Sequence, residues 1–184
     1  MKKVITVLLA VTMLFTFVAC KQSTGTLIGD DSCIIPVTNL DDFDWEGIWD
    51  YTAKIHTFTT EETTEIYKKG YSTFNKKNEK IVVEERTTNY HEFAKFSDME
   101  SYIEAKNFNI DYYENNEGLL EKSEYNDEEK TILIVAKGIP VVKLLSTFKS
   151  NWKDFTVTTN TSKTSIEFSY NDETSSKTYI YKKR

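Results

Sequence analysis

The stretch GIWDYTAKI, residues 47–55, decides the fold of this chain. Its apolar side chains occupy every second position, at Trp49, Tyr51, Ala53 and Ile55. Successive side chains of a strand point to opposite faces of a sheet, so these residues share one face. Residues 47–55 therefore predict a half-buried β-strand whose apolar face is turned to a core.

Two further segments continue the alternation along the chain. Residues 64–74 place Tyr67 and Tyr71 on one face, and residues 80–90 combine an Ile-Val-Val run with alternating polar residues. Gly70 lies inside the first of these segments, where a glycine often marks a β-bulge. Polar turns separate the segments, which predicts an antiparallel meander.

A first helix is expected after this meander. The sequence SDME, residues 97–100, matches a capping box, in which the serine and glutamate side chains satisfy free amide groups at a helix start. The helix is expected to end near Asn107, with Phe96, Met99 and Ile103 on its buried face and Tyr102 as a further candidate for that face.

A second helix is expected from Pro140 to Trp152. Proline is tolerated in the first turn of a helix, and apolar residues such as Leu144, Phe148 and Trp152 follow at helical spacing. The apolar face of this helix is expected to pack on a sheet.

The other segments with a period of two complete the predicted fold. They cover residues 108–112, 119–125, 131–136, 155–160, 164–170 and 177–181. The fold class expected is α+β and rich in β: an antiparallel, strongly curved sheet or partial barrel of about nine strands with two helices packed on it. Residues 43–184 are expected to form one domain of ordinary size.

The N-terminal residues have the signals of a secreted protein. Lys2 and Lys3 precede an uncharged, mainly apolar run, so residues 1–19 are interpreted as a signal peptide and residues 20–42 as a flexible tether. The sequence FVAC, residues 17–20, resembles the lipobox of bacterial lipoproteins, although the family usually has leucine at its first position.

The lipobox resemblance implies that Cys20 is acylated and anchors the chain to a membrane of the cell envelope, with the domain outside the cytoplasm. Two alternatives stay open: a signal peptide cut without lipid attachment, and an uncut anchor. If Cys20 carries no lipid, it has Cys33 as a disulfide partner, since the chain contains only these two cysteines.

Charge argues against nucleic acid as a partner. Removal of residues 1–19 takes away two lysines and no acid, so the net charge changes from −6 to −8. Such a surface repels phosphate backbones.

Signals for catalysis, metals and cofactors are sparse. His56 and His91 are the two histidines and have no metal-ligand spacing, so both are expected on exposed strands or loops. The chain also lacks the Gly-x-Ser-x-Gly elbow of serine hydrolases. The domain is therefore interpreted as non-enzymatic, with no metal and no cofactor. A hydrolase that uses paired carboxylates remains an alternative, because acidic residues distant in sequence can meet in space.

Two resemblances concern the ligand. Gly47-Ile48-Trp49 resembles the Gly-x-Trp that opens lipocalins, and the order of elements is similar to that of the lipoprotein-carrier fold, a half-barrel with helices on its concave face. The leading hypothesis is a membrane-anchored lipoprotein that binds an unknown protein, glycan or lipid. The alternative is a carrier of a small amphiphile. The predicted cavity residues are Trp49, Tyr51, Ile55, Leu133, Val135, Leu144, Phe148 and Trp152, and a filled core at these positions is the competing interpretation.

Overall fold

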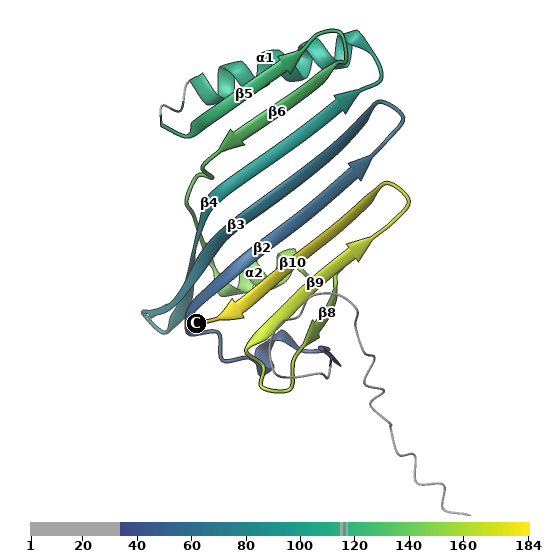
Figure 1. The fold of residues 1–184 in the computed structure, drawn as a ribbon. Helices are drawn as coiled ribbons and strands as arrows, with labels where there is room; N and C mark the ends of the chain where they lie inside the picture. Colours follow the sequence, from purple (N-terminus) through teal and green to yellow (C-terminus); the bar gives the residue numbers. More distant parts are fainter. Residues whose placement is uncertain (1–33, 115, 117) are drawn as a thin grey trace, which may run out of the picture.

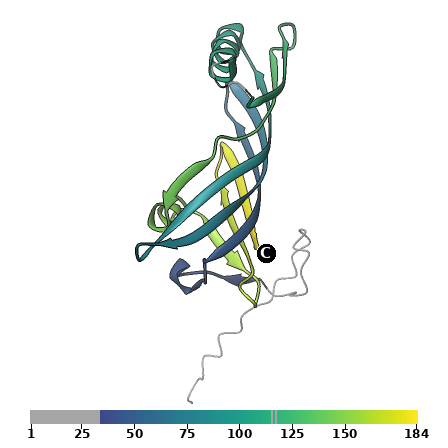
Figure 2. The same cartoon turned by 90° about the vertical axis from the view of Figure 1, so that its left-hand side faces the viewer.

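One antiparallel sheet contains all ten strands of the part of the chain that the structure describes (Figure 1). The computed structural model describes residues 34–114, 116 and 118–184. The strands follow the order β1-β8-β9-β10-β2-β3-β4-β6-β5, and β7 pairs with β4. The sheet is strongly curved and does not close into a barrel, so the predicted β-rich α+β class with a curved antiparallel sheet is confirmed (Figure 2).

The elements have the following bounds. The strands are β1 (Ile35–Pro36), β2 (Gly47–Phe58), β3 (Glu62–Lys77), β4 (Lys80–Phe96), β5 (Leu120–Asn126), β6 (Thr131–Ala136), β7 (Val141–Leu144), β8 (Thr156–Thr159), β9 (Ser165–Asn171) and β10 (Ser175–Lys183). The helices are the 3₁₀ turn η1 (Leu40–Asp42), α1 (Met99–Glu114) and α2 (Leu145–Asn151).

Strands β2, β3 and β4 form the long spine of the sheet. They contain 12, 16 and 17 residues. At about 3.3 Å per residue, β4 extends for roughly 55 Å, which is far longer than an ordinary strand. Helices α1 and α2 lie on the same, concave side of the sheet, toward opposite ends of these strands (Figure 2).

The concave face carries two separate hydrophobic cores. The first, here called the α2 core, centres on Phe148, which is fully buried. Its buried members are Phe43, Trp45, Trp49, Tyr51, Phe74, Val83, Phe148, Trp152, Val157, Ile166, Phe168 and Tyr181. The second, the α1 core, consists of Ala94, Phe96, Tyr102, Ile132, Ile134 and Ala136.

Residues 34–42, assigned to the tether from the sequence, pack against the α2 end of the sheet. Strand β1 pairs with β8, and the backbone N–H of Val37 donates to the carbonyl of Val157 at 2.8 Å. The indole N–H of Trp45 donates to the carbonyl of Leu40 at 2.7 Å. Because Trp45 is itself buried in the α2 core, this bond ties the entering chain to the domain.

Helix α1 differs from its prediction in length and in its cap. The Oδ1 atom of Asp98, not the side chain of Ser97, accepts the N–H of Ser101 at 2.8 Å. The helix continues to Glu114, so the strand expected at residues 108–112 does not exist. Phe108 and Tyr112 misled the strand prediction, since a separation of four residues also fits one face of a helix.

The buried face of α1 agrees with the prediction at Tyr102 and differs from it at Met99 and Ile103. Tyr102 is buried in the α1 core, whereas Met99 and Ile103 are 46% and 47% exposed. Phe96 is buried as expected, but it belongs to the end of β4.

The helix predicted from Pro140 begins five residues later. Val141 to Leu144 form β7, which pairs with residues 82–85 of β4. Strand β6 covers only residues 90–95 on this edge of β4, so the backbone beyond it needs another partner. That requirement overrides the helical spacing of the apolar side chains.

The bulge expected at Gly70 is confirmed. The register between β3 and β4 shifts between Lys69 and Gly70. At Gly70 the neighbouring strand approaches so closely that a Cβ atom would lie 2.1 Å from the carbonyl oxygen of Arg86 and 2.9 Å from the Cα of Thr87. Only glycine fits this position without a shift of the backbone.

We therefore expect Gly70→Ala to lower the free energy of unfolding by about 1–3 kcal/mol, the usual cost of overpacking. Thermal and urea unfolding followed by circular dichroism measure the effect. Lys69→Ala is the matched control, because the preceding side chain is exposed and its loss should change stability by less than about 0.5 kcal/mol. Equal stability of the two variants would contradict the steric account of the bulge.

Candidate ligand-binding groove

A groove of about 1040 Å³ lies on the concave face between the two cores. This volume is at the upper end of the usual range for small-molecule sites. The aromatic side chains that line it are Tyr51, Tyr90, Phe96, Phe108, Tyr112, Tyr113, Trp152, Phe155, Tyr179 and Tyr181. The charged ones are Glu61, Glu62, Lys68, Glu85, Glu92, Glu104, Lys137, Lys143 and Lys177.

Small residues occupy part of the concave face of the long strands. Ala53 of β2, Gly70 of β3 and Ala94 of β4 are all buried and project little or nothing from the sheet. Neither α1 nor α2 is long enough to reach the other helix. The middle part of the long strands is therefore not covered by either helix.

Helix α1 forms one wall of the groove. Ala105, Phe108, Tyr112 and Tyr113 line it, and the rings of Phe108 and Tyr112 stack with their centroids 6.0 Å apart. Phe108 is 66% exposed, so its ring is available to a ligand at the rim.

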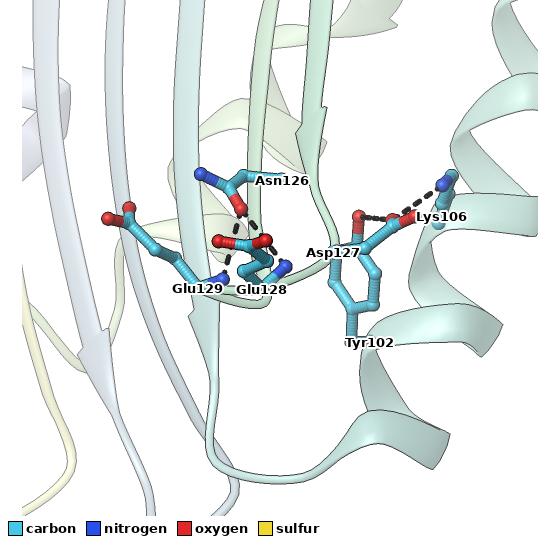
Figure 3. A network of polar contacts seen from close by, with 6 residues as sticks. All are labelled: Tyr102, Lys106, Asn126, Asp127, Glu128 and Glu129. Carbon is cyan, nitrogen blue, oxygen red and sulfur yellow. Dashed lines mark hydrogen bonds and ion pairs between the residues drawn. The ribbon is translucent and has the colours of Figure 1, made fainter.

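A polar network attaches α1 to the β5–β6 turn (Figure 3). The Asp127 carboxylate accepts hydrogen bonds from the Tyr102 hydroxyl at 2.6 Å and from the Lys106 ammonium at 2.7 Å. These bonds hold the pKa of Asp127 below its usual value. The turn itself is shaped by Asn126, whose Oδ1 accepts the backbone N–H groups of Glu128 and Glu129 at 3.0 Å.

The α2 end of the groove contains an ion pair held within the wall. Lys143 of β7 and Glu85 of β4 lie 2.6 Å apart, with side chains only 15% and 19% exposed. Tyr181 donates a hydrogen bond to the same carboxylate at 3.3 Å, and burial, reinforced by Glu85, raises the pKa of Tyr181. Tyr51 is hydrogen-bonded to Thr87 beside this pair.

Lys68, Tyr90 and Glu92 lie in the middle of the groove. The Lys68 ammonium is 5.4 Å from the centroid of the Tyr90 ring, and the Tyr90 hydroxyl donates to Glu92. Burial lowers the pKa of Lys68, while the carboxylates of Glu92 and Glu85 oppose the shift.

Two tyrosines in the middle of the groove, Tyr90 and Tyr113, have hydroxyl pKa values above the usual one. Burial is the main cause and the Glu92 carboxylate adds to it, so the pKa of Tyr113 rises to about 12 and that of Tyr90 is also raised. Both hydroxyls are therefore neutral at physiological pH and act as hydrogen-bond donors, not as bases.

The predicted cavity residues are distributed over four environments. Tyr51 and Trp152 line the groove. Trp49 and Phe148 are fully buried in the α2 core, and Leu144 is 42% exposed at the end of β7. Leu133 and Val135 are half-buried on the opposite face of β6 from Ile132 and Ile134, and Ile55 and Leu133 line a second hollow.

Sequence reasoning missed Lys68, Tyr90 and Glu92. The side chains at 66, 68, 70, 72 and 74 of β3 share one face, and fully buried Phe74 identifies it as the concave one. The sequence pattern draws attention to Tyr67 instead, but Tyr67 is 38% exposed on the convex face. The signal that places Lys68 inside is the alternating Ile66-x-Lys68-x-Gly70 series that leads to Phe74.

Both histidines lie on the convex face, beside the second hollow of about 580 Å³. His56 of β2 is opposite Glu65, and His91 of β4 is opposite Tyr67. Both are exposed, as expected from the sequence. Across the residues that the structure describes, no three His, Cys, Asp or Glu side chains group as ligands for a metal ion.

Comparison with known proteins gives no relative: no family model, curated protein or solved structure matches the chain. The search for membrane spans, made over the described residues, finds no helix of sufficient length and apolar character to cross a membrane. Cys20 lies outside the described residues.

We expect Asp127→Ala to loosen α1 from the sheet, because it removes the shared acceptor of Tyr102 and Lys106. Hydrogen–deuterium exchange should become faster in residues 99–114 than in β2 and β3. Glu128→Ala in the same turn is the control, since Glu128 bonds to Asn126 through its backbone N–H, which the substitution keeps. Unchanged exchange in Asp127→Ala would show that the α1 core alone fixes the helix.

Proposed function

We propose that this chain is a lipoprotein of the bacterial cell envelope that binds, and does not convert, a small molecule with an apolar body in the concave groove. The observation that carries the proposal is the aromatic lining of the groove in a space of about 1040 Å³. Rings of this kind suit alkyl chains and other apolar surfaces. The anchor is supported by the lipobox-like residues 17–20.

Binding is favoured over hydrolysis by the placement of both histidines and of Glu85 and Glu92, two of the five acids that line the groove. Glu85 and Glu92 face the groove from one strand, separated by about 20 Å at the rise of a β-strand. The carboxylate pair of a glycoside hydrolase is separated by roughly 5–10 Å. The two histidines lie on the other face of the sheet, so they do not supply a base to the groove.

A carrier of a membrane amphiphile is the second candidate, and the open groove favours it. The chain from Cys20 to residue 34 spans at most about 50 Å when fully extended, so an acylated Cys20 keeps the domain near the lipid surface. A carrier should therefore co-purify with lipid, which native mass spectrometry of gently isolated protein detects.

We expect Phe108→Ala to weaken binding of the neutral fluorescent amphiphile 1-N-phenylnaphthylamine by roughly tenfold, because an apolar wall of the groove is removed. A fluorescence titration gives the dissociation constant. The fold should be retained, since Phe108 is already 66% exposed.

Ile103→Ala is the matched control for this titration. Ile103 is on the same helix, is 47% exposed and does not line the groove, so its removal should leave affinity unchanged. Failure of the wild-type protein to bind the probe, or equal loss in both variants, would overturn the assignment of the groove.

We expect Cys20→Ala to abolish incorporation of radiolabelled palmitate and to move the protein from the membrane fraction, since the acylated thiol is lost. Cys33→Ala should leave both properties unchanged and serves as the control. Palmitate labelling that persists in Cys20→Ala would contradict the proposed anchor.

A further inference from the structure

Lys68 and Lys177 are the two lysines of the groove without a carboxylate within 4.0 Å, among the residues that the structure describes. The other two groove lysines are paired: Lys143 with Glu85 at 2.6 Å and Lys137 with Glu121 at 3.8 Å. Lys68 and Lys177 are each placed over an aromatic ring instead, at 5.4 Å from the centroids of Tyr90 and Tyr170.

The pairing of the strands brings these two lysines to opposite sides of β2. Lys68 of β3 is opposite Ala53, and Lys177 of β10 is opposite Ile55. Ala53 and Ile55 are two residues apart on the same face of β2, so both lysines rise from the concave floor. Their backbones are separated by about 12 Å, two strand spacings combined with an offset of two residues along the strands. The Lys68 ammonium lies toward Tyr90 of β4 and the Lys177 ammonium toward Tyr170 of β9, so both long side chains turn toward β2 when they share one anion.

The nearest neighbours of Lys68 in the sheet are mainly apolar, while the carboxylates of Glu92 and Glu85 act on its charge from farther away. Its direct neighbours on the concave face are Ala53 and Tyr90 across the sheet, and Ile66 and Gly70 along β3. A half-buried ammonium group in such surroundings has lost part of its hydration without gaining an ion pair in return. This cost is offset when an anion binds.

Three of the five acids that line the groove have hydrogen-bond partners of their own. Glu85 is bound by Lys143 and Tyr181, and Glu92 accepts the Tyr90 hydroxyl. Glu62 accepts the Thr64 hydroxyl, at the α1 end of β3. Each of these carboxylates already has a partner of its own.

We infer that Lys68 and Lys177 together hold the anionic group, a carboxylate or a phosphate, of an amphiphile whose apolar body lies toward Phe108 and Tyr113 on α1. This inference rests on the proposed function of the groove and adds the chemistry of its ligand. The two ammonium groups supply charge and hydrogen-bond donors, and the rings supply apolar contact.

The test is displacement of 1-N-phenylnaphthylamine by ligands with the same ten-carbon chain. Decanoate and decyl phosphate should displace the probe at concentrations roughly tenfold lower than 1-decanol, and decyltrimethylammonium should be the weakest, since charge-assisted hydrogen bonds contribute about this factor. Lys68→Met and Lys177→Met should each remove most of the preference for the anions. Lys68→Arg should retain it.

Lys69→Met is the matched control, because Lys69 is adjacent in sequence but exposed on the convex face. Its preference for the anions should equal that of the wild type. The inference is overturned if 1-decanol displaces the probe as well as decanoate does, or if Lys68→Met and Lys177→Met keep the preference. If inorganic phosphate displaces the probe at the same concentrations as decyl phosphate, the claim that the ligand is an amphiphile is overturned, and the groove contains an anion site only. Absence of probe binding in the wild type would instead defeat the proposed function.

Discussion

Backbone pairing along β2, β3 and β4 is the constraint on which the rest of the structure depends. These strands are longer than either core, so one continuous ladder serves both the α2 core and the α1 core. The ladder holds the two cores apart at a fixed distance, because a paired strand neither shortens nor bends freely. A groove between them follows directly, since each helix covers only the end of the sheet to which it is packed.

The bulge at Gly70 shows how sequence and groove are connected. Where the register shifts, the neighbouring strand approaches Gly70 too closely for any side chain, and the ring of Tyr51, which lines the groove, lies over Gly70. Ala53 of β2 and Ala94 of β4 are likewise small and buried on the concave face.

Two pairs of polar residues lie at different places in the groove. Lys143 with Glu85 stiffens the α2 end, and Tyr90 with Glu92 occupies the centre. Lys68, beside that centre, has charge but no carboxylate partner, which gives the groove a recognition feature that an apolar cavity lacks.

The sequence by itself determined the β-rich class, most strands of the sheet and the bulge at Gly70, because a period of two is a local property of consecutive residues. It misjudged α1 at residues 108–112 and the start of α2 at Pro140, where one spacing fits both a helix and a strand. Only the tertiary structure decided that β7 covers the free edge of β4, and that Lys68 and Lys177 lie on either side of β2 on one face of the sheet. Those results depend on register between strands distant in sequence, which no local pattern encodes.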